Sequence, residues 1–167
     1  MGNQSVTAVE INFDDIKQPL GVDSLGMRPM QSRAFTKRNA QHLLIKSPPA
    51  SGKSRCLMYI SLDKLANQGW KKVIVAVPEV SIGASFANTD LKSSGFFENW
   101  QIDKKWDLCA PGADTEDGAK SKVKTLLQFL QSDSKTLICT HATLRFAHQQ
   151  AGIEVFDNSV IAIDEFH

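Results

Sequence analysis

The sequence has no long hydrophobic run and few cysteines, and these absences exclude several classes of protein. Its apolar stretches, such as Val73–Val77, are short, whereas a membrane-spanning helix needs about 20 apolar residues. No basic segment followed by an apolar one opens the chain, so no secretory leader is predicted. The cysteines, Cys56, Cys109 and Cys139, are odd in number and widely spaced, which argues against a disulfide framework or a cysteine metal site. We expect reduced core thiols in a cytoplasmic protein without a membrane.

The composition is that of an ordinary globular protein, but its charges are unevenly placed. The chain has 167 residues, of which 42% are apolar and 22% charged, with a net charge of +1, and this length predicts one domain. Residues 1–27 hold four acids and one lysine, whereas residues 28–55 hold seven Lys and Arg and no acid. Such a basic run favours a polyanionic ligand or a solvated helix face. We therefore predict an acidic N-terminal extension over 1–27 and a domain over 28–167.

Short apolar runs alternate with helical patterns after residue 41. Strands are predicted at 42–46, 72–77, 106–110, 136–140 and 159–164, and helices at 52–67, 81–88, 119–131 and 141–149, with a loop over 111–118. This order predicts an α/β fold of three layers, with a mostly parallel sheet and helices on both faces. Ligands of such sheets bind at the carboxyl ends of the strands, which here are Ser47, Pro78, Thr140 and Asp164.

A phosphate-binding loop is indicated by residues 47–54, Ser-Pro-Pro-Ala-Ser-Gly-Lys-Ser, which follow the first of these strands and precede a helix. Small residues such as Ser51 and Gly52 let backbone N–H groups close around phosphate oxygens, and the helix N-terminus adds its dipole. Lys53 would reach the outer phosphates, and the Ser54 hydroxyl would bind Mg²⁺. The common pattern begins with Gly where this chain has Ser. A Pro-Pro turn that happens to precede Gly-Lys-Ser therefore stays an alternative.

Two adjacent carboxylates, Asp164 and Glu165, end the last predicted strand. Burying such a pair is costly unless a cation or a water site uses it. We expect Asp164 to hold Mg²⁺, and Glu165 to orient and deprotonate an attacking water. An Asp-Glu pair alone is weak evidence, but together with a Gly-Lys-Ser loop in an alternating α/β chain it predicts nucleotide hydrolysis.

These segments resemble the first RecA-like domain of a superfamily-two helicase or translocase of the DEAD/DExH-box kind, of the restriction-enzyme or DNA-repair type. Residues 47–54 resemble its motif I, and Asp164-Glu165-Phe166-His167 matches the Asp-Glu-x-His form of motif II. Arg28-Pro29-Met30-Gln31 resembles the Arg-Pro-x-Gln segment in which a Gln reads adenine, and a Gln amide can pair with N6 and N7 of that base. Pro78 and Thr140 lie where this family contacts nucleic acid.

The resemblance implies ATP and Mg²⁺ as cofactors and a nucleic acid as partner, with DNA favoured over RNA. Lys53 and Glu165 would act in catalysis, and His167 would couple the site to the bound strand or to a partner domain. Residues 28–167 would be a RecA-like domain that ends after motif II. A second RecA-like domain in a longer protein would provide arginine fingers, so the isolated chain is expected to bind and hydrolyse ATP poorly.

Several alternatives stay open. The chain could be a non-catalytic nucleotide-binding or interaction module with a P-loop fold, or a P-loop phosphotransferase. Gln31 could be a solvated surface residue, and Thr140 could act as a helix N-cap. The histidines His42, His141 and His148 are interpreted as structural or solvated residues. The tryptophans Trp70, Trp100 and Trp106 are interpreted as core residues. The resembled family places an extra strand between the loop strand and the motif II strand, for which residues 136–140 are the candidate.

Overall fold

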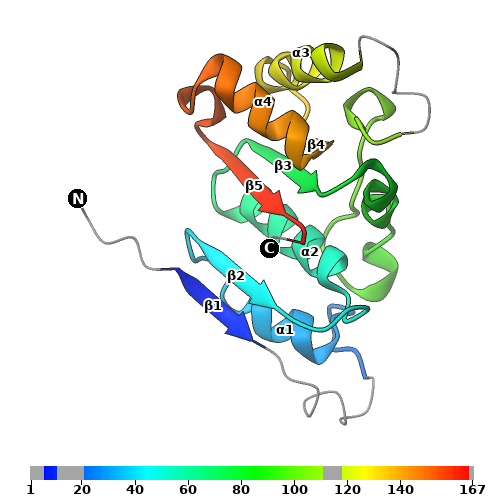
Figure 1. The fold of residues 1–167 in the computed structure, drawn as a ribbon. Helices are drawn as coiled ribbons and strands as arrows, with labels where there is room; N and C mark the ends of the chain where they lie inside the picture. The colour runs from blue at the N-terminus through cyan, green and yellow to red at the C-terminus, as the bar shows by residue number, and fades with distance from the viewer. Residues whose placement is uncertain (1–5, 11–20, 111–117, 166–167) are drawn as a thin grey trace.

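The structure is a computed structural model that describes residues 6–10, 21–110 and 118–165, and its ribbon alternates strands and helices (Figure 1). The strands are β1 (Thr7–Glu10), β2 (Leu43–Lys46), β3 (Lys72–Val77), β4 (Thr136–Thr140) and β5 (Ser159–Ile163). The α-helices are α1 (Pro29–Phe35), α2 (Lys53–Asn67), α3 (Gly118–Gln131) and α4 (His141–Ala151). Short 3₁₀ helices are η2 (Val80–Phe86), η3 (Lys92–Ser94), η4 (Lys104–Trp106) and η5 (Glu154–Phe156). None of the described helices is both long enough and apolar enough to cross a membrane.

The named strands pair in parallel throughout the described residues. β1 pairs with β2, and β3 lies between β4 and β5 in a second sheet. Within that sheet Val77 is opposite Thr140, and Ala76 is opposite Ile163. The carboxyl ends of β3, β4 and β5 therefore meet at one edge. The predicted α/β class, with parallel strands and helices packed on them, is confirmed.

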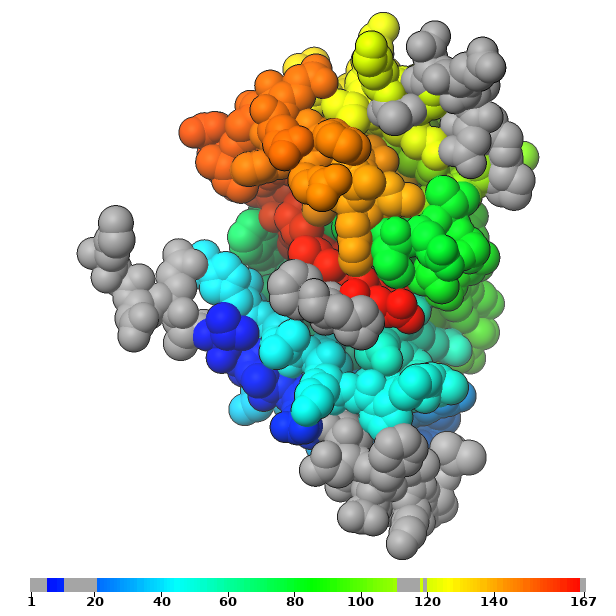
Figure 2. All heavy atoms as spheres, in the orientation of Figure 1, coloured from blue at the N-terminus to red at the C-terminus, as the bar shows by residue number. Residues whose placement is uncertain are grey.

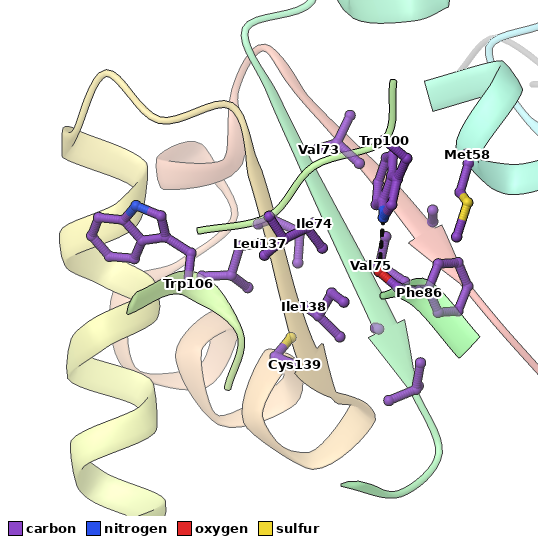
Figure 3. Close-up of a cluster of buried hydrophobic side chains, with 14 of the residues drawn as sticks. Met58, Val73, Ile74, Val75, Phe86, Trp100, Trp106, Leu137, Ile138 and Cys139 are labelled. Atoms are coloured by element: carbon purple, nitrogen blue, oxygen red, sulfur yellow. Dashed lines mark hydrogen bonds between the residues drawn. The ribbon is translucent and has the colours of Figure 1, made fainter. Parts of the chain in front are cut away.

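The core is built around β3, all of whose residues are buried. Figure 3 shows Val73, Ile74 and Val75 of this strand beside side chains of β4, with Trp100 and Phe86 packed against them. The indole Nε1 of Trp100 donates to the carbonyl of Phe86 at 2.9 Å, so this buried ring leaves no unsatisfied N–H. The prediction that Trp100 belongs to the core is confirmed.

The remaining core predictions concern two tryptophans and the thiols. Trp70 is only partly buried, with the Lys64 ammonium 5.9 Å from its ring, and does not belong to the core. Trp106 is buried, in contact with the Phe129 ring of α3, as predicted. The three cysteines are buried, and none of them forms a disulfide within the part of the chain that the structure describes. Burial raises the pKa of the Cys56 thiol to about 12, which keeps it protonated and unreactive at neutral pH.

One local prediction is wrong, and another differs in helix type and bounds. Residues 106–110 do not form a strand: η4 ends at Trp106, and a single bridge joins Asp107 to Ile138 of β4. The Asp107 carboxylate accepts from the Cys109 N–H at 3.0 Å, and this local bond closes a turn in place of a ladder. The predicted helix over 81–88 is the 3₁₀ helix Val80–Phe86. The predicted loop over 111–118 lies, apart from Gly118, outside the described residues.

The order of the strands also differs from the expectation. β4 is the neighbour of β3 on the side away from β5, so residues 136–140 are not a strand between the loop strand and the motif II strand. β2 and β5 are less buried than predicted, with Leu44, Ile161 and Ile163 more than a third exposed. In Figure 2 residues of β5 (red) reach the surface between α4 (orange) and the segment of β2 and the following loop (cyan).

Part of the predicted N-terminal extension is built into the fold. Thr7–Glu10 forms β1, which pairs with β2 and adds an ion pair of 2.8 Å between Glu10 and Lys46. Met27, at the other end of the predicted extension, is buried in the main core. The domain boundary between residues 27 and 28 stays a prediction.

A buried lysine joins the start of β3 to the end of α3. The Lys72 ammonium donates to the carbonyls of Phe129 (3.1 Å), Ser132 and Ser134 (2.6 Å), which lie at the C-terminal end of α3 or just beyond it. A cation there bonds carbonyls at the end of the helix and lies at the negative end of the helix dipole. Burial lowers the pKa of Lys72, and the charge of Asp133 raises it.

We expect Lys72→Met to lower the free energy of unfolding by about 2–3 kcal/mol, because carbonyls bonded to a buried charge lose their donor. Lys71→Met is the matched control, because the neighbouring Lys71 is exposed. Urea denaturation of both variants measures the difference. Equal stability of the two variants would contradict this role for Lys72.

Candidate nucleotide-binding site

The candidate site lies where the loop after β2 enters α2 and where β5 ends. Gly52 is the N-cap of α2, and its carbonyl accepts from the Cys56 N–H at 3.0 Å as the first helical bond. α2 packs against β5 (Figure 1). The N-terminus of a long helix and the carboxyl end of a strand thus lie at the same edge, where α/β folds place their ligands.

The loop is closed by its own small residues. The hydroxyls of Ser47 and Ser51 lie 2.8 Å apart, and the Ser51 N–H donates to the Pro48 carbonyl at 3.4 Å. Ala50 and Gly52 adopt left-handed φ values of 59° and 91°. These turns direct the chain from the end of β2 into the first turn of α2, as a phosphate-binding loop requires.

Lys53 is held over this loop. Its ammonium donates to the carbonyls of Ser47 (3.2 Å) and Pro48 (3.3 Å). These are neutral acceptors, and an anionic phosphate oxygen is a stronger partner for an ammonium group. Lys53 is therefore placed to exchange loop carbonyls for phosphate.

The acidic pair at the end of β5 divides into a buried and an exposed carboxylate. Asp164 is 5% exposed, and its N–H donates to the Ala76 carbonyl at 2.9 Å. Burial, and next the charge of Glu165, raise the pKa of Asp164, while a backbone hydrogen bond, Lys53 and His141 act in the opposite direction. Glu165 is exposed and has a left-handed φ of 52°. The two acids thus have the different environments that separate roles require.

One residue of this site was missed from the sequence. His141, the first residue of α4, lies with Nε2 3.0 Å from the carbonyl oxygen of Asp164, so its imidazole joins the end of β4 to the end of β5. The signal in the sequence was its position directly after a predicted strand end. Thr140 accepts from the Thr143 N–H at 3.3 Å and caps α4, which confirms the N-cap interpretation.

The segment before the loop also reaches it. Gln31 is 1% exposed, so the reading of Gln31 as a solvated surface residue is wrong. Its Nε2 donates to the Gly52 carbonyl at 3.0 Å, and its Oε1 accepts from the Arg28 N–H at 2.8 Å. The Arg28 guanidinium donates to the Ala50 carbonyl at 3.4 Å. A contact between Gln31 and adenine stays a prediction, and His167 lies outside the described residues.

Ser54 and Asp164 offer a hydroxyl and one carboxylate for a divalent cation. The described residues contain no cluster of three or more His, Cys, Asp or Glu side chains that could hold a metal ion. Mg²⁺ commonly takes one or two carboxylates and completes its shell with substrate phosphates and water. The donor set therefore fits Mg²⁺ bound together with a phosphate group, and Mg²⁺ stays a prediction.

Comparison with known proteins relates this chain to one named protein. It is 57% identical over 159 residues to the Bacillus subtilis (strain 168) protein named "Putative ATP-dependent helicase YeeB". The chain is homologous to one part of that protein. The matched region covers 95% of this chain and 26% of the relative, so the chain spans about a quarter of the relative's length. No protein-family model matches the chain, and no solved structure matches it.

A separate apolar hollow of about 400 Å³ lies between α4, η5 and β5. Its lining side chains come mainly from these three elements and are mostly apolar: Ala76, His141, Leu144, Arg145, His148, Ile153, Phe156, Ile161 and Ile163. His141 is shared with the candidate site, whereas Lys53 and the loop do not line the hollow. Its chemistry does not suit a triphosphate.

Replacing Gly52 tests how tightly the loop is built. A Cβ at residue 52 would lie 2.6 Å from Gln31 Nε2, whereas a Cβ at Gly69, which also has a positive φ, would meet nothing within 4 Å. Both Gly→Ala variants introduce backbone strain of about 1–2 kcal/mol. We expect Gly52→Ala to lose about 1–3 kcal/mol more from overpacking, measured by urea denaturation. Equal losses of unfolding free energy in the two variants would show that the Gln31 side chain can move away without cost.

Proposed function

We propose that this chain forms the ATP-binding motor domain of a nucleic-acid-dependent helicase or translocase, in which ATP hydrolysis drives movement on DNA or RNA. The observation that carries the proposal is geometric: α2, which begins at Lys53, packs against β5, which ends just before Asp164. The Lys53 charge accordingly acts to lower the pKa of Asp164. Homology to part of a protein named as an ATP-dependent helicase supports the same function.

The loop and α2 supply the phosphate-binding groups. The backbone at Ser51 and Gly52, with the N-terminus of α2, faces the triphosphate. Lys53 leaves the carbonyls of Ser47 and Pro48 to bond the outer phosphates. Ser54 and Asp164 would hold Mg²⁺, which would neutralise phosphate charge.

Glu165 is the proposed general base. Its exposure lets it contact water, whereas the adjacent Asp164 is buried. The Glu165 carboxylate accepts the proton of the water that attacks the γ-phosphate. His167 follows two residues later and would relay the state of the site to the bound strand or to a second RecA-like domain.

Nucleic acid is proposed to bind along the edge where β3 and β4 end. Pro78 follows β3, and Thr140 ends β4, so both lie on the edge that holds Asp164. Contacts there would be mainly to the phosphate backbone, with DNA favoured over RNA. The His141 bond to the Asp164 carbonyl offers a direct route from this edge to the hydrolytic carboxylates.

We expect Lys53→Ala to weaken Mg²⁺-ATP binding by at least about tenfold, because a charge-assisted contact with phosphate is lost. Lys71→Ala, which removes an exposed lysine away from the loop, should leave the affinity unchanged. Isothermal titration calorimetry measures both. An unaltered chain that binds no nucleotide at millimolar concentration would refute the nucleotide site and leave the interaction-module reading.

We expect Glu165→Gln to keep ATP binding and to lower turnover by about 10²–10⁴-fold, as the loss of a general base does. Phosphate release is measured in the full-length encoded protein with and without single-stranded DNA or RNA, and ATP affinity is measured in parallel. Gln150→Glu, an exposed change in α4, is the control. Turnover that survives in Glu165→Gln would refute the assigned base.

A further inference from the structure

Gln31 is a buried amide whose two ends are both bonded within the chain. Its Nε2 donates to the Gly52 carbonyl at 3.0 Å, and its Oε1 accepts from the Arg28 N–H at 2.8 Å. Pairing with the N6 and N7 atoms of adenine needs both amide atoms at a surface. With 1% of its surface exposed, Gln31 presents neither atom to a base.

The bond from Gln31 orients the peptide that opens α2. The Gly52 carbonyl accepts from both Gln31 Nε2 and the Cys56 N–H, each at 3.0 Å. Because a trans peptide is planar, fixing this carbonyl also fixes the Lys53 N–H, which points the opposite way. That N–H is directed out of the N-terminus of α2, toward the position proposed for phosphate.

The helix that carries Gln31 packs on α2. Met30 and Ala34 of α1 pack in one buried cluster with Cys56 and Ile60 of α2, so the packing of α1 on α2 fixes the position of the segment that carries Gln31. Gly52 has no side chain, and a Cβ there would lie 2.6 Å from Gln31 Nε2. The amide thus reaches the loop backbone only because residue 52 is glycine.

We propose that Gln31 is a positioning residue of the phosphate loop, which sets the Gly52–Lys53 peptide for phosphate and does not select the base. The inference rests on the proposed function, since it concerns the same nucleotide site. It requires that substitution of Gln31 weaken the affinity for every triphosphate equally, including a triphosphate without a base. If Gln31 contacted adenine, its substitution would weaken the affinity for ATP more than the affinity for a triphosphate without a base.

The test compares three ligands and two variants. Gln31→Glu keeps the shape but sets an acceptor against the Gly52 carbonyl, and Gln31→Met keeps the length but removes both hydrogen bonds. Gln150→Glu, exposed in α4, is the matched control. Calorimetry with Mg²⁺-ATP, Mg²⁺-GTP and Mg²⁺-tripolyphosphate is run below the melting temperature of every variant. We expect both Gln31 variants to bind all three ligands about tenfold more weakly, with the control unchanged.

Two results would overturn the proposal. Affinity for ATP that falls while affinity for tripolyphosphate stays constant would assign Gln31 to the base, and unchanged affinity for all three ligands would show that its bond does not position the loop. If one Gln31 variant fails to fold, the other decides.

A second readout needs no ligand. The Cys56 N–H shares the Gly52 carbonyl with Gln31, so its hydrogen exchange reports how firmly that carbonyl is held. We expect about tenfold faster exchange in both Gln31 variants. Unchanged hydrogen exchange would overturn the positioning role, whether or not the unaltered chain binds a triphosphate. Failure of the unaltered chain to bind any triphosphate would instead refute the proposed function alone.

Discussion

The parallel pairing of β4 and β5 on the two sides of β3 decides where the candidate functional residues that follow these strands lie. Val77 is opposite Thr140, and Ala76 is opposite Ile163, so the three strands end at nearly the same height. β3 is buried on both faces, so a shift by one residue would exchange the side chains of two closely packed faces. Thr140, His141 and the acidic pair therefore lie at one edge of the sheet as a result of strand pairing.

The charged groups at that edge are suited to bind further ions of opposite charge. Asp164 is buried, and the neighbouring Glu165 adds to the raised pKa that burial imposes. Lys53 moderates this effect, but its ammonium is bonded to the loop carbonyls of Ser47 and Pro48. A phosphate group bound with a divalent cation would give the lysine an anionic partner and the buried carboxylate a cationic one. Both groups would then be better satisfied than they are by the chain alone.

Local sequence patterns predicted most of the helices and strands. They did not predict contacts between segments that are distant in the sequence. β3, β4, α2, α3 and α4 follow from apolar periodicity, and the loop follows from small residues beside a helix start. β1 (Thr7–Glu10) was missed because a four-residue strand carries little periodic signal. The predicted position of β4 was wrong, because both edges of β3 offer the same backbone hydrogen-bonding groups and the sequence does not say which strand pairs with which edge. The burial of Gln31 was hidden by the basic residues around it, and it depends on the distant Gly52.

The departures of the loop from the common phosphate-loop pattern follow from its backbone. Among the described residues of the loop, only Ala50 and Gly52 have a positive φ, so residue 47 does not need glycine. Ser47 instead contributes a hydroxyl that meets the Ser51 hydroxyl at 2.8 Å. Ala50 is exposed, so its Cβ meets solvent and its left-handed conformation adds only about 1–2 kcal/mol of strain. At Gly52 a Cβ would in addition press on the buried Gln31 amide. Glycine is thus required only where the loop backbone touches Gln31, and an unrelated Pro-Pro turn would have no reason to make that contact.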